Sequence, residues 1–435
     1  METIYAVASG LAPAGVAIIR VSGAAALLTY KNLTHRPVPL PRKATFGSFR
    51  DPGTRALLDK GMALYFPAPA SFTGEDVMEY HLHGGAATVK GFLDVLSRQP
   101  ECRLAQPGEF TRRAFENGKM DLTAAEAVAD LVAAETEAQR TQALEQLAGH
   151  LARLYEGWAE RLQKILAHQE AEIEFPDEDM PAGVAAGLTP EIGKLLSEIR
   201  AHLDDGHRGE RLRNGVLIAI VGAPNAGKSS LLNALARRDA AIVSEEAGTT
   251  RDIVEVHLDL GGYPVILADT AGLRDAAGKV EAEGIRRAKK IAGAADIKLV
   301  LFDGTGAPDA ETRKLVDDGA IVVATKADLK NFAAPEKALP VSSVSGTGMD
   351  ALLKALTEKV SGLFGKKAGP SLTRERHRAA LQETAAALER SLAAGLPELA
   401  AEDLRLSLRA LGQITGRVHV EALLDRIFKD FCIGK

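Results

Sequence analysis

The stretch GAPNAGKS at residues 222–229 directly follows an apolar run at residues 216–221 and precedes a helical pattern. It matches G-x-x-x-x-G-K-[ST] in the strand–loop–helix context that a phosphate-binding loop requires. Its glycines allow backbone N–H groups to face phosphates at a helix N-terminus. Lys228 can neutralise β and γ oxygens, and the Ser229 hydroxyl can bind magnesium. The stretch therefore predicts an α/β domain that binds a nucleoside triphosphate.

Two further motifs follow in the order expected of a nucleotide switch. The β-type run at residues 265–268 ends in DTAG, where Asp269 can hold the magnesium shell and the Gly272 amide can sense a γ-phosphate. Between this motif and the first lies GTTRD at residues 248–252. Thr250 is the expected switch residue there, because a mobile threonine can bind the metal only while triphosphate is present.

The choice of base is indicated by TKAD at residues 325–328, after the β-type run at residues 321–324. The Asp328 carboxylate can accept hydrogen bonds from N1 and N2 of guanine, which adenine does not offer. Guanine is therefore predicted, and a P-loop ATPase is disfavoured. Guanine motifs usually begin with asparagine. With Thr325 at this position the motif lacks the asparagine amide, but it keeps the Asp328 carboxylate that distinguishes guanine from adenine.

Hydrolysis needs a group that orients water, and Leu273, directly after DTAG, offers no hydrogen bond. Glu281 is the candidate, with a solvated helix carboxylate as the alternative. Because no arginine stands out as a finger, we expect a monovalent cation to offset the transition-state charge. Asn225 and main-chain oxygens of residues 244–249 can form its cage, unless Asn225 only shapes the loop.

Length and periodicity predict two or three domains in the 435 residues. Short β-type runs up to about residue 117, such as 15–21 and 62–66, indicate an α+β domain. Leucine, tryptophan and isoleucine recur at helical spacing from Leu144 to Ile165, which predicts one long amphipathic helix. Residues 213–365 read as an α/β unit with helical sequence on both sides. Periodicity does not distinguish three consecutive domains from a helical domain with an inserted α/β unit.

Charge and cysteine content exclude some classes of protein. Fifty-three basic and 58 acidic residues give a net charge of −5, so any RNA contact is expected to be local or delegated to a partner. The two cysteines are too few for a disulfide framework or a paired zinc motif. There is no basic stretch followed by an apolar run at the N-terminus, and no apolar segment of about 20 residues. We expect a soluble, cytoplasmic protein.

Along its whole length the chain resembles the MnmE (TrmE) family of tRNA uridine-modification GTPases. The nucleotide motifs and several further blocks carry the resemblance: GVAIIRVSG at 15–23, SFTGED at 71–76, HGG at 83–85, PGEFT at 107–111, FPDE at 175–178 and FCIGK at 431–435. The resemblance implies an α+β tetrahydrofolate-binding and dimerisation domain at 1–117. It also implies an all-α domain at 118–211 and 366–435, with an α/β P-loop GTPase domain inserted at 212–365.

The resemblance also implies a function. A homodimer would join the FAD-dependent MnmG protein in a heterotetramer, which installs an aminomethyl or carboxymethylaminomethyl group at C5 of the wobble uridine in tRNAs. The one-carbon unit would come from 5-formyl- or 5,10-methylene-tetrahydrofolate. Potassium would bring two GTPase domains together, and GTP hydrolysis with Mg²⁺ would drive the cycle.

Residue roles follow from the motifs and the resemblance together. The GTP-binding residues are expected to be Asn225, Ala226, Gly227, Lys228, Ser229, Ser230, Ser244, Glu245, Glu246, Ala247, Gly248, Thr249, Thr250, Asp269, Thr270, Ala271, Gly272, Thr325, Lys326, Asp328, Ser342, Ser343 and Val344. Magnesium is expected at Ser229 and Thr250, potassium at Asn225, Ser244, Glu246 and Thr249, and folate at Arg20, Glu79, Lys119 and Lys435. The expected catalytic residues are Glu281, Lys228 and Cys432.

Three features of the sequence allow more than one interpretation. Cys432 can deliver a thiol to the folate site or be a half-buried structural cysteine, whereas Gly434 and Lys435 make a lipidation box improbable. His81 and His83 share one side of an expected strand, but no third metal ligand is evident, so packing or a folate contact is favoured. The main rival function is an RNA-binding GTPase switch without modifying activity, against which the net charge and the FCIGK block argue.

Overall fold

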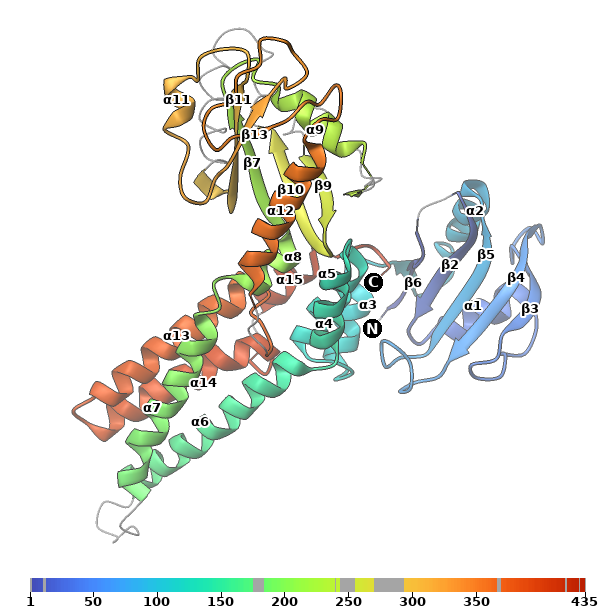
Figure 1. The fold of residues 1–435 in the computed structure, drawn as a ribbon. Helices are drawn as coiled ribbons and strands as arrows, with labels where there is room; N and C mark the ends of the chain where they lie inside the picture. Colours follow the sequence, from blue (N-terminus) through green and yellow to red (C-terminus); the bar gives the residue numbers. More distant parts are fainter. Residues whose placement is uncertain are drawn as a thin grey trace, which may run out of the picture. The chain divides into compact units, whose positions relative to one another are not determined.

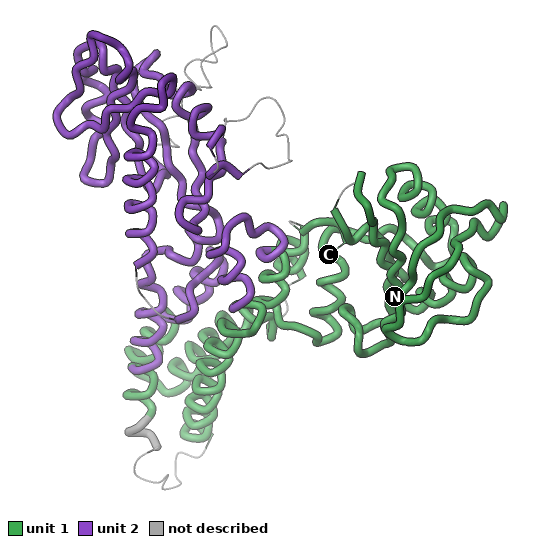
Figure 2. Tube along the Cα trace, turned by 45° about the vertical axis from the view of Figure 1, so that its right-hand side comes forward, with its two compact units in different colours: residues 1–129, 146–193, 386–435 green, residues 130–145, 194–385 purple. Residues whose placement is uncertain are grey.

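The computed structural model describes residues 2–10, 13–174, 184–238, 240–242, 255–269, 293–365, 369–418, 421–429 and 431–434 (Figure 1). The chain forms two compact units (Figure 2). Unit 1 comprises residues 1–129, 146–193 and 386–435, and unit 2 comprises residues 130–145 and 194–385. Each unit is therefore assembled from segments that are far apart in the sequence.

Unit 1 contains a mostly antiparallel sheet whose described strands follow the order β3-β4-β5-β2-β1-β6. These strands are β1 (Thr3–Val7), β2 (Ala14–Ser22), β3 (Thr45–Arg50), β4 (Leu57–Phe66), β5 (Val77–Gly84) and β6 (Cys102–Leu104). Helices α1 (Ala26–Thr34) and α2 (Ala86–Leu96) cover one face. Ile19, Tyr80 and Phe92 are fully buried in the core that they enclose.

The opposite face of this sheet carries charged side chains near its centre. In the pairing of β2 with β5, Arg20 lies opposite Glu79, and Ile18 lies opposite His81. Successive side chains of a strand point to opposite faces, so these residues face away from Ile19. The alternation that fills the core thus leaves an ionic pair on the other side of the sheet.

The helices of unit 1 lie after this sheet in the sequence. They are α3 (Glu109–Glu116), most of α4 (Leu122–Ala133), α6 (His150–Glu174), α14 (Pro397–Thr415) and α15 (Glu421–Lys429). Helices α6 and α14 lie side by side. Phe115 and Leu122 form a core cluster with Phe428 and Phe431, which anchors the last described residues on α3 and α4.

The prediction of one long helix from Leu144 to Ile165 is wrong. Helix α5 (Glu137–Leu147) ends before α6 begins at His150. Gly149 lies between them with φ 82°, a left-handed conformation that glycine adopts without a steric penalty. Its N–H donates to the carbonyl of Gln146, which closes the end of α5. Leucine spacing continues across the break, so periodicity did not reveal it.

Unit 2 contains a mixed sheet with the described strands in the order β13-β12-β11-β7-β10-β9-β8. The strands are β7 (Val216–Gly222), β8 (Ala241–Ile242), β9 (Glu255–Leu260), β10 (Tyr263–Asp269), β11 (Ile297–Asp303), β12 (Ile321–Thr325) and β13 (Leu339–Pro340). Strands β10, β7, β11, β12 and β13 are parallel, and β9 is antiparallel to its two neighbours. Parallel strands place their carboxyl ends at a common edge, where α/β proteins bind ligands.

Helices cover this sheet and build its core. They are α8 (Arg208–Asn214), α9 (Lys228–Ala236), α11 (Ala310–Arg313) and α12 (Met349–Phe364), while α5, α7 (Val184–Leu203) and α13 (Glu375–Ala393) belong partly to each unit. Leu231 of α9 and Leu356 of α12 are buried in one cluster with Ile218 of β7. Helix α9 is thereby fixed directly behind the phosphate-binding loop.

The predicted fold class is confirmed: the chain combines an α+β part, a helical part and an α/β P-loop part. The boundaries 1–117, 118–211 with 366–435, and 212–365 stay a prediction, because each compact unit also takes in helical segments. Within the described ranges, no helix is long and apolar enough to cross a membrane.

Candidate functional site

The phosphate-binding loop joins β7 to α9 at the carboxyl edge of the parallel strands. Asn225 (φ 62°) and Gly227 (φ 86°) adopt left-handed conformations, which turn the chain into α9. Lys228 is only 7% exposed, and its Nζ donates to the carbonyl oxygens of Gly222 (2.9 Å) and Ala223 (2.8 Å). The ammonium group therefore lies against the loop backbone, where phosphate oxygens can take the place of these carbonyls.

A hydroxyl and a carboxylate meet beside this loop. Ser229 Oγ donates to Asp269 Oδ2 at 2.6 Å. Asp269 ends β10, is 2% exposed and lies in register with Ile220 of the parallel strand β7. Hydroxyl and carboxylate oxygens are the hard donors that magnesium prefers. The two residues therefore fit a magnesium site, with Ser229 as the ligand and Asp269 behind it.

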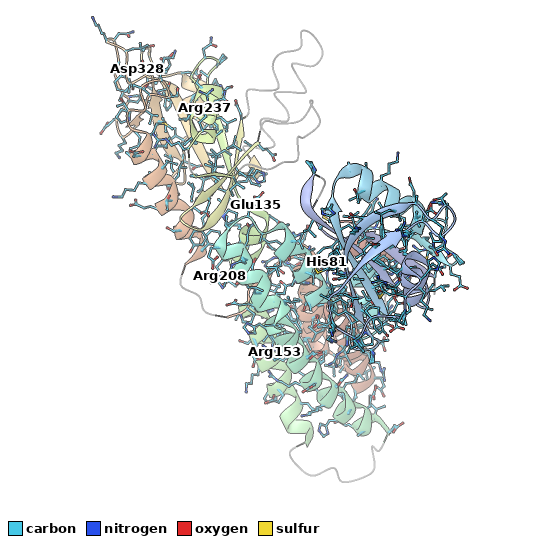
Figure 3. The ribbon with its side chains drawn as sticks, turned by 90° about the vertical axis from the view of Figure 1, so that its right-hand side faces the viewer. His81, Glu135, Arg153, Arg208, Arg237 and Asp328 are labelled. Atoms are coloured by element: carbon cyan, nitrogen blue, oxygen red, sulfur yellow. The ribbon has the colours of Figure 1, made fainter. Side chains whose placement is uncertain are left out.

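The base-recognition motif follows β12 at the same edge. Asp328 is exposed, and it lies at the end of unit 2 remote from Glu135 (Figure 3). Lys326 has φ 64°, and its Nζ lies 2.5 Å from Asp303 Oδ2 at the end of β11. Burial opposes ionisation of Asp303, but hydrogen bonds from Lys326 and Thr305 outweigh it and lower the pKa of this carboxyl to about 2. The motif is thus held to the neighbouring strand through an ionised aspartate.

The other expected GTP contacts in unit 2 lie next to these motifs. Thr325 is buried at the end of β12, against the phosphate-binding loop. Ser342 Oγ accepts hydrogen bonds from the N–H groups of Val344 and Ser345, which shapes the loop after β13. A pocket of about 370 Å³ opens between this loop and α9, and its lining includes Ser230, Ser343 and Val344.

Some of the predicted site residues lie outside the described residues. This applies to the first switch, to most of the second switch and, in the folate site, to Lys435. The residues concerned are Ser244, Glu245, Glu246, Ala247, Gly248, Thr249, Thr250, Thr270, Ala271, Gly272, Glu281 and Lys435. Their roles stay predictions.

A second candidate site lies on the face of the unit 1 sheet that points away from α1 and α2. Arg20 Nε donates to Glu79 Oε1 at 2.9 Å, and both side chains are mostly buried. The guanidinium carbon of Arg20 lies 5.4 Å from the ring centre of Phe72 and 5.7 Å from that of Phe110. An arginine held by a carboxylate and bordered by aromatic rings can bind a planar ligand with an anionic group.

His81 adds an unsatisfied polar atom to this surface. Its Nε2 lies 3.8 Å from Glu79 Oε2, which is too long for a hydrogen bond. The atom is buried, and no described residue gives it a hydrogen-bond partner. A buried nitrogen of this kind is costly unless a ligand or water completes it. The residues present therefore fit a heterocycle such as a pterin.

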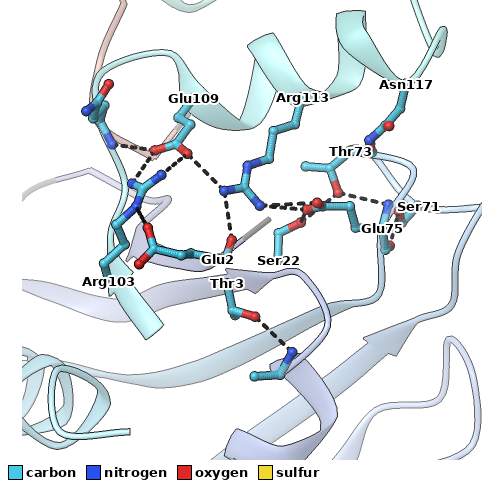
Figure 4. Close-up of polar contacts among 12 residues, drawn as sticks. Glu2, Thr3, Ser22, Ser71, Thr73, Glu75, Arg103, Glu109, Arg113 and Asn117 are labelled. Carbon is cyan, nitrogen blue, oxygen red and sulfur yellow. Dashed lines mark hydrogen bonds and ion pairs between the residues drawn. The ribbon is translucent and has the colours of Figure 1, made fainter. Parts of the chain in front are cut away.

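An ionic network supports the loop that carries Phe72 (Figure 4). Arg113 is 4% exposed and donates to both carboxylate oxygens of Glu75, to Glu109 Oε1 at 2.9 Å and to the carbonyl of Glu2. Burial opposes the ionisation of Glu109, but hydrogen bonds from Arg103, the Gln106 N–H and Arg113 lower the pKa of its carboxyl to about 2. The network joins α3 to the residues that flank Phe72.

Lys119 and Cys432 lie near the same elements. Lys119 Nζ donates to the carbonyl of Pro69, in the loop that leads to Phe72. Cys432 is exposed, not half-buried, and its carbonyl accepts a hydrogen bond from the Gly108 N–H, two residues before Phe110. The structure thus brings Cys432 to the start of α3, whose Phe110 contacts Arg20.

Two family models together match almost the whole chain. The model described as "GTP-binding protein TrmE N-terminus" matches residues 3–119, and "MnmE helical domain" matches residues 122–432. Curated relatives agree over the full length. The tRNA modification GTPase MnmE of Parvibaculum lavamentivorans is 56% identical and that of Rhodospirillum rubrum 52%, each alignment covering 100% of both chains.

The chain belongs to the MnmE family. Solved structures with a similar part include the G domain of the T. maritima FeoB iron transporter, which is 24% identical and has a TM-score of 0.25 over 33% of this chain and 98% of that one. A TM-score this low supports no conclusion about the fold or function of this MnmE-family chain.

Sequence reasoning missed three participants in this MnmE-family chain. Asp303, which holds Lys326, follows a β-type run and precedes a glycine, so it carries a weak signal of a strand end. Phe72 and Phe110 stand inside the SFTGED and PGEFT blocks, but only the fold brings them to Arg20. His83 was paired with His81 as a possible metal ligand, yet it binds Asp59, and no metal-binding cluster occurs among the described residues.

Proposed function

We propose that this member of the MnmE family is a potassium-activated GTPase that helps modify the wobble uridine of tRNAs. With an FAD-dependent partner of the MnmG kind, it would install an aminomethyl or carboxymethylaminomethyl group at C5, using a tetrahydrofolate one-carbon unit. The observation that carries the proposal is the contact between Ser229 and Asp269 beside the phosphate-binding loop. It is supported by relatives that are named tRNA modification GTPases.

In the proposed GTP complex, amides of residues 225–230 and the Lys228 ammonium bind the phosphates. The position of Lys228 against the loop backbone supports this role. Ser229 would hold magnesium together with Thr250, and the metal would supply charge neutralisation between the β- and γ-phosphates. Asp328, exposed at the strand edge, would accept from guanine N1 and N2.

Hydrolysis would depend on Glu281 and on potassium. Glu281 would orient the attacking water, because Leu273 offers no hydrogen bond. Potassium would be held by the side chain of Asn225 with main-chain oxygens at Ser244, Glu246 and Thr249. The left-handed backbone and exposed side chain of Asn225 are compatible with a ligand at the rim of the loop.

The face of the unit 1 sheet that carries Arg20 and Glu79 would bind folate. Arg20 and Glu79, with Lys119 and Lys435, would bind the pterin and the anionic glutamate tail. The aromatic rings beside Arg20 and the unsatisfied nitrogen of His81 support a planar heterocyclic ligand. Cys432 is exposed near α3 and would deliver its thiol to the one-carbon unit.

Partners are proposed from family membership and charge. The chain would form a homodimer through the folate-binding domain and a heterotetramer with the FAD-dependent partner. A net charge of −5 argues against a basic surface that binds tRNA without help. An RNA-binding GTPase switch without modifying activity is the rival, and it predicts no folate binding.

The test is GTP turnover in potassium and in sodium, with and without Glu281→Ala. We expect fast turnover of the unchanged chain in potassium, and slow turnover of the unchanged chain in sodium and of Glu281→Ala in either salt. Glu283→Ala is the matched control, because it removes an equal charge two residues away and is expected to leave turnover unchanged. Equal rates in both salts for the unchanged chain and Glu281→Ala would contradict the proposed mechanism.

A further inference from the structure

Thr325 stands where guanine motifs usually carry asparagine, and its side chain is turned into the protein. It is 6% exposed, and its Oγ1 lies 2.8 Å from the carbonyl oxygen of Ala226 and 3.2 Å from that of Phe302. A hydroxyl carries one hydrogen, so the shorter contact is the main hydrogen bond. Because its polar side-chain atom is engaged inside the protein, Thr325 is not positioned as a reader of the base.

The acceptor belongs to the peptide group between Ala226 and Gly227, in the middle of the phosphate-binding loop. A trans peptide is planar, so the Gly227 N–H points opposite to the carbonyl that Thr325 holds. A carbonyl that accepts a hydrogen bond also polarises the N–H of its own peptide group. The Thr325 hydroxyl therefore both orients and strengthens the Gly227 donor.

Packing makes this contact rigid. A methyl group built on Gly227 would lie 3.5 Å from Thr325 Cβ and Oγ1, so the end of β12 touches the loop directly. On its other side, the Thr325 carbonyl accepts from the Gly304 N–H at 3.1 Å. Thr325 is thus fixed to β11 by its backbone and to the phosphate-binding loop by its side chain.

We propose that Thr325 is a positioning residue for the phosphates: its hydroxyl holds the Ala226–Gly227 peptide in the orientation that binds them, while Asp328 reads guanine. This inference rests on the proposed binding of guanine nucleotides. It adds to that proposal that two residues of one motif have separate roles. Thr325 supports binding of the phosphates, and Asp328 recognises the base.

The experiment measures dissociation constants for GDP and IDP with magnesium, by isothermal titration calorimetry on the full chain. IDP lacks the 2-amino group of guanine, so the ratio of the two constants reports base reading. Thr325→Ser and Thr325→Ala differ by the hydroxyl alone, and Thr325→Val keeps the shape of threonine without its hydroxyl. Thr357→Val is the matched control, because it removes a hydroxyl that donates to a helix carbonyl of Leu353.

Thr325→Val and Thr325→Ala are expected to bind both nucleotides roughly tenfold more weakly, with the GDP-to-IDP ratio unchanged. The dissociation constants of Thr325→Ser are expected to stay within about twofold of those of the unchanged chain, since the serine hydroxyl keeps the hydrogen bond to the Ala226 carbonyl. Asp328→Asn is expected to change the ratio instead. Thr357→Val is expected to bind like the unchanged chain.

Unweakened binding by Thr325→Ala, relative to Thr325→Ser, would overturn the inference. A changed GDP-to-IDP ratio in either hydroxyl-free variant would also overturn it, because the residue would then read the base. If Thr325→Val fails to fold, the serine and alanine variants decide the question. Failure of the unchanged chain to bind GDP would contradict the proposed function instead, so the two failures are distinguishable.

Discussion

Ser229 Oγ and Asp269 Oδ2 lie 2.6 Å apart although they are 40 residues apart in the chain. Ser229 lies in the first turn of α9 and Asp269 ends β10, and the parallel pairing of β7 with β10 brings them together. Two motifs identified separately in the sequence thereby form one candidate magnesium site. The phosphate-binding loop and the metal site share an edge because the strands share a direction.

Removing this hydroxyl tests the metal site. Ser229→Ala is expected to lower GTP turnover by at least about 100-fold and to raise the magnesium concentration needed for half-maximal rate, because a metal ligand is lost. Phosphate release measured over a magnesium series gives both quantities. Ser361→Ala, which changes an exposed serine on α12, serves as the control and is expected to behave like the unchanged chain.

Replacing the base-reading carboxylate tests specificity. Asp328→Asn is expected to weaken GTP binding and to improve XTP binding, because an amide can donate to the extra oxygen of xanthine. The ratio of the two affinities should shift by at least about tenfold. Competition against a fluorescent GDP analogue measures it. An unchanged ratio would remove Asp328 from the site.

The ionic network of Figure 4 makes stability depend on pH. Burial raises the pKa of Glu109, but hydrogen bonds from Arg103, the Gln106 N–H and Arg113 lower it to about 2, against 4.5 for an ordinary glutamate. A lowered pKa in the folded state gives stability that is present above pH 4.5 and is lost as pH falls toward 2. Glu109→Gln should therefore destabilise the chain less at pH 3.5 than at pH 7.

The loss of unfolding free energy caused by Glu109→Gln should be about 1 kcal/mol smaller at pH 3.5 than at pH 7. Denaturant unfolding of the variant and the unchanged chain at both pH values measures it. Glu398→Gln, at an exposed position of α14, is the control and is expected to give no such difference. A pH-independent effect of Glu109→Gln would mean that its ionisation is not what stabilises the fold.

Folate binding is tested at Arg20. Arg20→Ala is expected to weaken binding of 5-formyltetrahydrofolate by at least about tenfold, because it removes the cation held by Glu79. Arg55→Ala removes an equal charge at an exposed turn of the same unit and is expected to bind normally. Calorimetry with the purified chain measures both. Equal binding by the two variants would exclude this face of the sheet as the folate site.

Local motifs were predicted better than long-range contacts. The strand, loop and helix around Lys228 were expected from spacing, because each feature depends on neighbouring residues. The break at Gly149 was missed because leucine spacing continues across it, although a glycine can end a helix. The pairing of Lys326 with Asp303 depends on strand order, and the packing of Phe110 on Arg20 depends on how α3 lies on the sheet; periodicity contains neither.

The most direct test is multiple-turnover phosphate release from GTP and from ATP at equal concentrations, in potassium and magnesium. Because Asp328 can pair with guanine but not with adenine, GTP is expected to be hydrolysed at least about 100-fold faster. Equal turnover of the two nucleotides would contradict the account at its centre.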